Sequence, residues 1–66
     1  MRITVNGTAA DVADGASIGD LVRDRIDDRR RVAVARNGEV VPRAQWDSTP
    51  LRESDSVEVL APTAGG

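Results

Sequence analysis

Two Asn-Gly pairs, Asn6-Gly7 and Asn37-Gly38, limit the folds open to this chain more than any other feature of its sequence. Both residues of such a pair tolerate a positive φ, so Asn-Gly between strand-like segments is the strongest short-range indication of a two-residue β-hairpin. Residues 1–6 alternate between apolar and polar side chains, as a half-buried strand does, and residues 8–12 are expected to return antiparallel to them. After the second pair, residues 40–41 form a short strand, which the proline that follows ends or confines to a sheet edge. The chain is therefore expected to form one hairpin at each pair.

A helix is expected between the two hairpins. Ser17 is a favourable N-cap, and Asp20 lies three residues later, where its carboxylate completes a capping box. Apolar residues then recur at the spacing of one helix face: Ile18, Leu21, Val22 and Ile26. Three arginines, 29–31, follow at or just past the helix end, where positive charge is favourable. We interpret them as a solvated helix end, and an anion-binding patch is the alternative.

The remaining strand patterns place this helix on one face of a sheet. Residues 32–35 form a continuous apolar run, which predicts a strand buried on both faces at the centre of the sheet. Residues 57–60 form the last strand, with Val57 and Val59 toward the helix and Leu60 on the opposite face. A right-handed crossover allows the first and last strands to lie side by side in parallel. The order of elements predicts an α+β fold of the β-grasp (ubiquitin-like) type: a mixed sheet of four to five strands, with one helix packed on one face and the other face open for docking.

Trp46 is the only aromatic residue of the chain. It is expected to fill the core beneath a loop, with its indole N–H bonded to a backbone carbonyl group. Leu51 is expected to anchor the same region. A binding role for Trp46 is the alternative.

The residue types in the chain exclude most catalytic functions. Its 66 residues form one domain, which is too small to hold a deep catalytic cleft beside a core. The sequence contains no His, Cys, Tyr or Lys, so the usual nucleophiles, general bases and zinc ligands are missing. A formal net charge of −2 argues against nucleic acid as the main partner, and no apolar run is long enough for a membrane span or a signal peptide. We therefore expect a cytoplasmic protein that holds no metal or cofactor and is monomeric when free.

The last five residues, 62–66, read Pro-Thr-Ala-Gly-Gly and are expected to form a flexible tail on a β-grasp domain of residues 1–61. Glycine loses more conformational freedom on ordering than any other residue, so a terminal pair has no packing role to explain it. Without side chains at Gly65 and Gly66, the backbone can enter a narrow channel and present its last carboxylate to the active site of another protein. A frayed end is the alternative interpretation.

Short motifs lie along the whole chain: Asn6-Gly7, Ser17 to Leu21, Ala35-x-Asn37, Val41-Pro42-Arg43-x-x-Trp46, Leu51, Asp55 and the terminal Gly65-Gly66. Together they resemble the thiamine-biosynthesis sulfur carrier (ThiS) family of ubiquitin-like proteins. Val-Pro-Arg-x-x-Trp combined with terminal Gly-Gly separates that family from the molybdopterin synthase small subunit, which shares the fold and the tail. The chain departs from the family at Ser54-Asp55-Ser56, where the family often has Asp-Gly-Asp, and this leaves the type of turn open.

The resemblance implies chemistry at the carboxylate of Gly66. An E1-like (ThiF-like) adenylyltransferase would adenylate it with ATP, and sulfur derived from a cysteine desulfurase system would displace AMP to leave a thiocarboxylate. A ThiG-like thiazole synthase would then take this sulfur into the thiazole of thiamine, so the chain would be a protein co-substrate and not an enzyme. Two tail residues lead to the reacting group, Ala64 and Gly65, and three residues would contact partners, Leu60, Pro62 and Thr63.

Three other functions are compatible with the same residues. A carrier of the same fold could feed molybdopterin or amino-acid biosynthesis, and the neighbouring genes would distinguish these pathways. A ubiquitin-like modifier would join Gly66 to lysines of target proteins and would produce isopeptide-linked ladders. A plain interaction module with an incidental tail would be unaffected by removal of Gly66.

Overall fold

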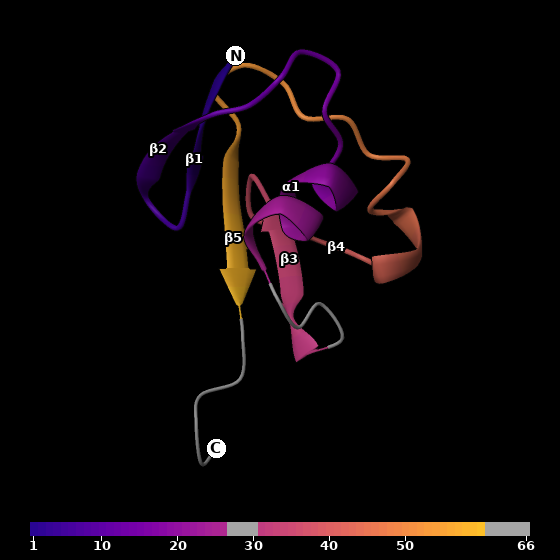
Figure 1. Cartoon of the computed structure of the whole chain (residues 1–66). Coiled ribbons are helices and arrows are strands. Elements are labelled where there is room, and N and C mark those ends of the chain that lie inside the picture. Colours follow the sequence, from indigo (N-terminus) through magenta and orange to yellow (C-terminus); the bar gives the residue numbers. More distant parts are fainter. Residues whose placement is uncertain (27–30, 61–66) are drawn as a thin grey trace.

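The computed structural model describes residues 1–26 and 31–60. These residues form a mixed sheet of five strands in the order β2-β1-β5-β3-β4, with one α-helix against one face (Figure 1). In chain order the elements are β1 (Arg2–Val5), β2 (Thr8–Asp11), α1 (Ile18–Arg25), β3 (Ala33–Arg36), β4 (Glu39–Val41), a 3₁₀ helix (Arg43–Gln45) and β5 (Ser56–Leu60). The predicted α+β class and β-grasp arrangement are confirmed. Within the described residues, no helix has the length and apolar character needed to cross a membrane.

Both Asn-Gly pairs form the predicted hairpin turns. The angle φ is 51° at Asn6 and 81° at Gly7, and it is 52° at Asn37 and 86° at Gly38. Positive φ at both central residues defines a type I′ turn, whose twist matches that of the strands on either side. β1 pairs antiparallel with β2, and β3 with β4, so each turn joins neighbouring strands.

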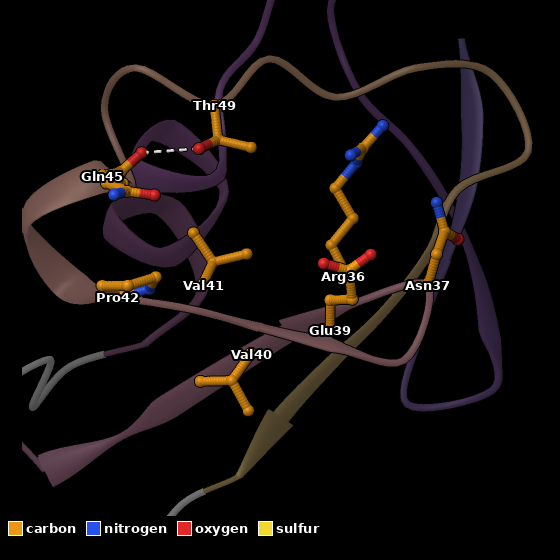
Figure 2. Close-up of a pocket in the computed structure, with 8 residues that line it drawn as sticks. All are labelled: Arg36, Asn37, Glu39, Val40, Val41, Pro42, Gln45 and Thr49. Carbon is orange, nitrogen blue, oxygen red and sulfur yellow. Dashed lines mark hydrogen bonds between the residues drawn. The ribbon is translucent and has the colours of Figure 1, made fainter.

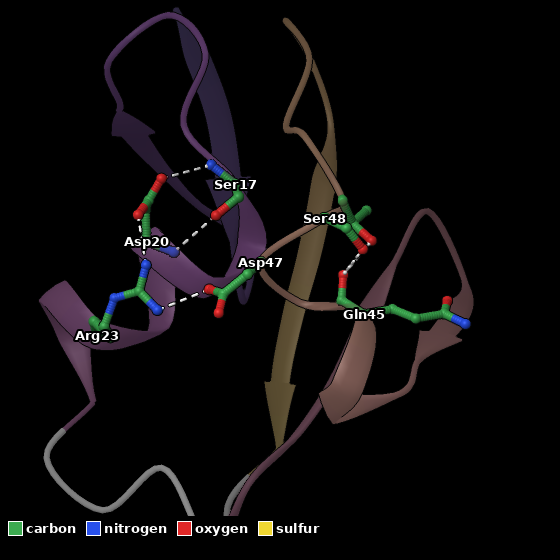
Figure 3. A network of polar contacts seen from close by, with 7 residues as sticks. Ser17, Asp20, Arg23, Gln45, Asp47 and Ser48 are labelled. Carbon is green, nitrogen blue, oxygen red and sulfur yellow. Dashed lines mark hydrogen bonds and ion pairs between the residues drawn. The ribbon is translucent and has the colours of Figure 1, made fainter.

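Helix α1 begins at the predicted capping box (Figure 3). Ser17 Oγ accepts a hydrogen bond from Asp20 N at 3.1 Å, and Asp20 Oδ2 accepts one from Ser17 N at 3.0 Å. Two carbonyl groups of the loop 46–49 accept hydrogen bonds from the N–H groups of the first two helical residues, each at 3.0 Å. These N–H groups have no partner within a helix. The loop is therefore attached directly to the start of α1.

Arg23 makes two exposed ion pairs, one with Asp20 within α1 and one with Asp47 in this loop (Figure 3). One guanidinium nitrogen lies 2.7 Å from Asp20 Oδ1 and the other lies 2.7 Å from Asp47 Oδ1. The pKa of Asp20 is lowered, and the main cause is the hydrogen bond that its carboxylate accepts from Ser17 N–H. The next largest cause is the hydrogen bond from Arg23. Of the three arginines expected after the helix, 29 and 30 lie outside the described residues and Arg31 is exposed.

The hydrophobic core lies between α1 and the sheet face that α1 covers. Eleven described side chains are buried in it: Ile3, Ala10, Ile18, Leu21, Val22, Val32, Val34, Trp46, Leu51, Val57 and Val59. The predicted position of Trp46 is confirmed, because its ring is buried and its Nε1 donates a hydrogen bond to Val41 O at 3.0 Å. The guanidinium carbon of Arg43 lies 5.0 Å from the ring centroid, at cation–π distance. The burial of Leu51 is confirmed as well.

The prediction that residues 32–35 lie at the centre of the sheet is wrong. β5 occupies the centre, with β1 parallel to it on one side and β3 antiparallel to it on the other. Nor is β3 buried on both faces, since Val34 is buried whereas Ala33 is exposed. The right-handed crossover leaves the position beside β1 free, and the last strand fills it. The continuous apolar run arises because small alanines alternate with the buried residues.

Candidate functional site

The sheet face opposite α1, called the open face below, carries the side chains that point away from the core. Side chains alternate between the two faces of a sheet, so the strand registers assign ten residues to it: Arg2, Thr4, Ala9, Asp11, Ala33, Ala35, Val40, Ser56, Glu58 and Leu60. None of the ten is buried. On β1 and β2 the open face is polar, and Arg2 Nε donates a hydrogen bond to Asp11 Oδ1 at 3.0 Å. On β5, β3 and β4 it is largely apolar.

Four side chains on this second part are called the apolar patch: Ala33, Ala35, Val40 and Leu60. The strand register places Ala33 opposite Leu60 and Ala35 opposite Val40. Val40 is 73% exposed and Leu60 is 58% exposed, and they are the large hydrophobic residues that the described part of the chain leaves exposed. The predicted orientation of Leu60 is therefore confirmed. An exposed apolar surface of this kind is suited to contact with another protein.

A pocket of about 270 Å³ lies beside β4 (Figure 2). Figure 2 shows Val40 projecting from the side of β4 opposite Val41. The residues that line the pocket are Arg36, Asn37, Glu39, Val40, Val41, Pro42, Gln45 and Thr49. Most of them are polar, whereas cofactor sites are mostly apolar hollows with a few convergent polar groups. We therefore assign no cofactor to this pocket.

Two asparagine side chains hold β5 at its two ends. Asn6 Oδ1 accepts a hydrogen bond from Val59 N at 2.9 Å, and Asn6 Nδ2 donates one to Val59 O at 3.3 Å. At the start of the strand, Asn37 Oδ1 accepts a hydrogen bond from Ser56 N at 2.9 Å. The sequence indicated only that these asparagines form turns, and no local pattern could have shown that their amides reach β5. They fix the strand that leads to the C-terminal residues.

Asp55 fixes the turn that enters β5. Its buried carboxylate accepts hydrogen bonds from Arg36 Nε at 2.7 Å, Arg52 N at 2.8 Å and Asn37 Nδ2 at 3.0 Å. Burial alone would raise the pKa of Asp55, but these hydrogen bonds and the charge of Arg36 outweigh burial and lower it. The carboxylate is therefore ionised at neutral pH. The positive φ of this turn, 71°, is at Ser54 and not at Asp55, the residue that the comparison with Asp-Gly-Asp sets against the family's glycine.

Of the predicted site residues, Leu60 lies within the described part of the chain. Pro62, Thr63, Ala64, Gly65 and Gly66 lie outside the described residues, so their functions remain predictions. Val40 is a residue of the open face that was missed from the sequence, whereas alternation along the last strand already places Glu58 on the same face as Leu60, without a predicted role. Strict alternation across the Asn37-Gly38 turn would have indicated the exposure of Val40.

The described residues form a mixed sheet with a helix on one face, and the central strand precedes the sequence motif Gly65-Gly66. These features define the class of small β-grasp proteins of the ubiquitin-like type. The chain belongs to the ThiS family, whose family model matches residues 3–66.

Two solved structures resemble the chain throughout. The crystal structure of the thiamine biosynthesis protein ThiS from Geobacter metallireducens is 33% identical, with a TM-score of 0.86 and coverage of 100% of both chains. The solution structure of a thiamine biosynthesis protein from the same organism is also 33% identical, with a TM-score of 0.80 over 100% of this chain and 88% of that chain.

A curated relative is much longer. A thiazole synthase from Paramagnetospirillum magneticum is 29% identical over 66 residues, which are 100% of this chain and 20% of the relative. The chain therefore spans about a fifth of the length of that protein.

Proposed function

We propose that the chain is a sulfur carrier for the biosynthesis of the thiazole of thiamine. The observation that carries the proposal is the similarity over both full chains to the ThiS protein of Geobacter metallireducens, with a TM-score of 0.86. A carrier needs a stable body, a docking face and an unhindered carboxylate, and it needs no catalytic side chain. The body and an exposed sheet face are present in the described residues. The chain is then a co-substrate, and ATP belongs to the partner that activates it.

The reaction begins at the carboxylate of Gly66. A carboxylate is a poor acyl donor at neutral pH, and attack of its oxygen on the α-phosphorus of ATP releases pyrophosphate and forms an acyl adenylate. A persulfide sulfur from a cysteine desulfurase system attacks the carbonyl carbon, and AMP leaves. Cleavage of the S–S bond by a thiol leaves the sulfur on Gly66 as a thiocarboxylate. Gly65 and Ala64 offer little steric hindrance to this chemistry, because they carry at most a methyl group.

Two partners act on the carrier: an E1-like adenylyltransferase that activates Gly66 and a thiazole synthase that accepts the sulfur. The second partner is supported by the thiazole synthase of Paramagnetospirillum magneticum, a fifth of which is similar to this whole chain. A carrier and its acceptor on one polypeptide would meet at a high effective concentration. All of these reactions take place in the cytoplasm.

We propose that the partners dock on the apolar patch and also contact Pro62 and Thr63, which follow Leu60 closely in the sequence. Leu60 is the last residue of β5 and is exposed, and protein interfaces are poor in charge at their centres. The substitution Leu60→Glu should therefore weaken binding to the activating enzyme at least about tenfold, with the melting temperature unchanged. Calorimetric titration and thermal unfolding measure the two effects. A sharp fall in melting temperature instead would mean that Leu60 stabilises the fold.

The pathway is tested by deletion of the gene. The deletion strain should require thiamine or its thiazole moiety for growth and should make molybdopterin normally. Reintroduction of the gene should remove the requirement. Growth without thiamine, together with loss of molybdoenzyme activity, would assign the carrier to molybdopterin biosynthesis.

A further inference from the structure

Glu58 is the charged side chain that the strand registers place against the apolar patch. It lies two residues before Leu60 on β5, and both side chains are on the open face. Its partner across the β5–β3 pair is Ala35, and the partner of Ala35 on β4 is Val40. A carboxylate is therefore set beside small and apolar side chains on the middle strand of the sheet.

The carboxylate of Glu58 is exposed and makes no hydrogen bond or ion pair with any other described residue. Other carboxylates of the body are engaged. Asp11 on the same face pairs with Arg2, Asp47 pairs with Arg23, and Asp55 pairs with Arg36. The polar part of the open face thus carries a neutralised pair, whereas the apolar part carries one uncompensated negative charge.

An uncompensated charge beside an apolar patch has a direct consequence for binding. A protein that covers the patch also removes water from Glu58, and transfer of an unpaired carboxylate out of water is strongly unfavourable. A cation placed opposite the carboxylate offsets this cost and adds a charge-assisted hydrogen bond. A surface without such a cation is rejected, and this is how repulsive elements produce specificity.

We infer that Glu58 determines which surfaces the open face accepts: the activating enzyme presents an arginine or lysine opposite Glu58, surrounded by apolar side chains. This inference rests on the proposed function, and it adds the chemistry of the partner to the docking site. The small side chains of Ala33 and Ala35 support it, because they leave room beside Glu58 for a long cationic side chain. The net charge of −2 also favours the approach of a basic surface.

The test measures the affinity of the E1-like adenylyltransferase from the same cells for three variants. Glu58→Gln should raise Kd at least about tenfold and Glu58→Arg at least about a hundredfold, because a buried cation then faces a neutral or a positive group. The matched control is Asp24→Asn, which replaces an exposed carboxylate on α1 and changes the net charge by the same amount as Glu58→Gln. This control should alter Kd by no more than about twofold. The dependence of Kd on salt should be weaker for Glu58→Gln than for the parent. All three variants should melt like the parent protein.

The cation itself is found by substitution of arginines and lysines on the enzyme. One change to glutamate should restore binding of the Glu58→Arg variant. A Kd for Glu58→Gln equal to that of Asp24→Asn, with normal ATP-dependent adenylation of the parent, overturns this inference and leaves the proposed function intact. Absence of adenylation of the parent overturns the proposed function, and the inference with it.

Discussion

Deletion of Gly66 is expected to abolish ATP-dependent adenylation of the protein while leaving its fold intact. The reaction takes place at the terminal carboxylate, and loss of one residue withdraws this group from the active site of the activating enzyme by about 3.5 Å. Positioning of this kind decides the rate, because misplacement of a reacting group by about 1 Å can already lower activity about a hundredfold. Pyrophosphate release with the E1-like enzyme measures the activation, and thermal unfolding measures the fold. Adenylation of the shortened protein at the parental rate would contradict the assignment of Gly66.

Two further variants separate the position of the carboxylate from the shape of the tail. Addition of one residue after Gly66 should also abolish adenylation. Gly65→Val keeps the carboxylate in place but adds a branched side chain and restricts the backbone, so it should lose adenylation far more than it loses stability. Equal rates for this variant and the parent would count against a narrow channel in the partner.

In protein isolated from its own cells, the intact mass should show replacement of one oxygen by sulfur at Gly66.

Replacement of Trp46 by alanine is expected to unfold a large fraction of the molecules. Loss of a large buried aromatic side chain typically costs about 3–5 kcal/mol. Stabilities of roughly 0.05–0.15 kcal/mol per residue correspond to only about 3–10 kcal/mol for a chain of this length. The ring is 7% exposed, and its Nε1–H satisfies the carbonyl group of Val41. Urea denaturation should therefore show a much lower midpoint, and sulfur transfer should fall because little folded carrier remains.

Trp46→Phe is the matched control for this prediction. It keeps a smaller aromatic ring in the core and removes the five-membered ring with its N–H, so its loss of stability should be clearly smaller than that of Trp46→Ala. Activity of both variants should recover at lower temperature in proportion to the folded fraction. A Trp46→Ala protein that unfolds at the parental urea concentration but no longer transfers sulfur would instead make Trp46 a contact residue.

Much of the local structure could be predicted from the sequence, because it depends on residues close together in the chain. The type I′ turns follow from the ability of Asn6 and Asn37, each with its glycine, to adopt a positive φ. The capping box of Ser17 and Asp20 joins residues three positions apart. The orientation of Leu60 follows from the alternation of side chains along a strand, which a single strand already defines.

The sequence by itself therefore determined the order of the elements, the two hairpin turns and the face on which the first and last strands bury their side chains. Only the tertiary structure decided which strand lies at the centre of the sheet. β5 lies at the centre of the sheet, although the apolar run of residues 32–35 resembled the central strand more closely. The amide of Asn6 bonds to Val59, 53 residues away, and Glu58 lies beside Ala35. Such contacts depend on the registers between strands that lie far apart in the sequence. These registers are set by the pairing of the strands and by the packing of α1 on the sheet, which no local pattern encodes.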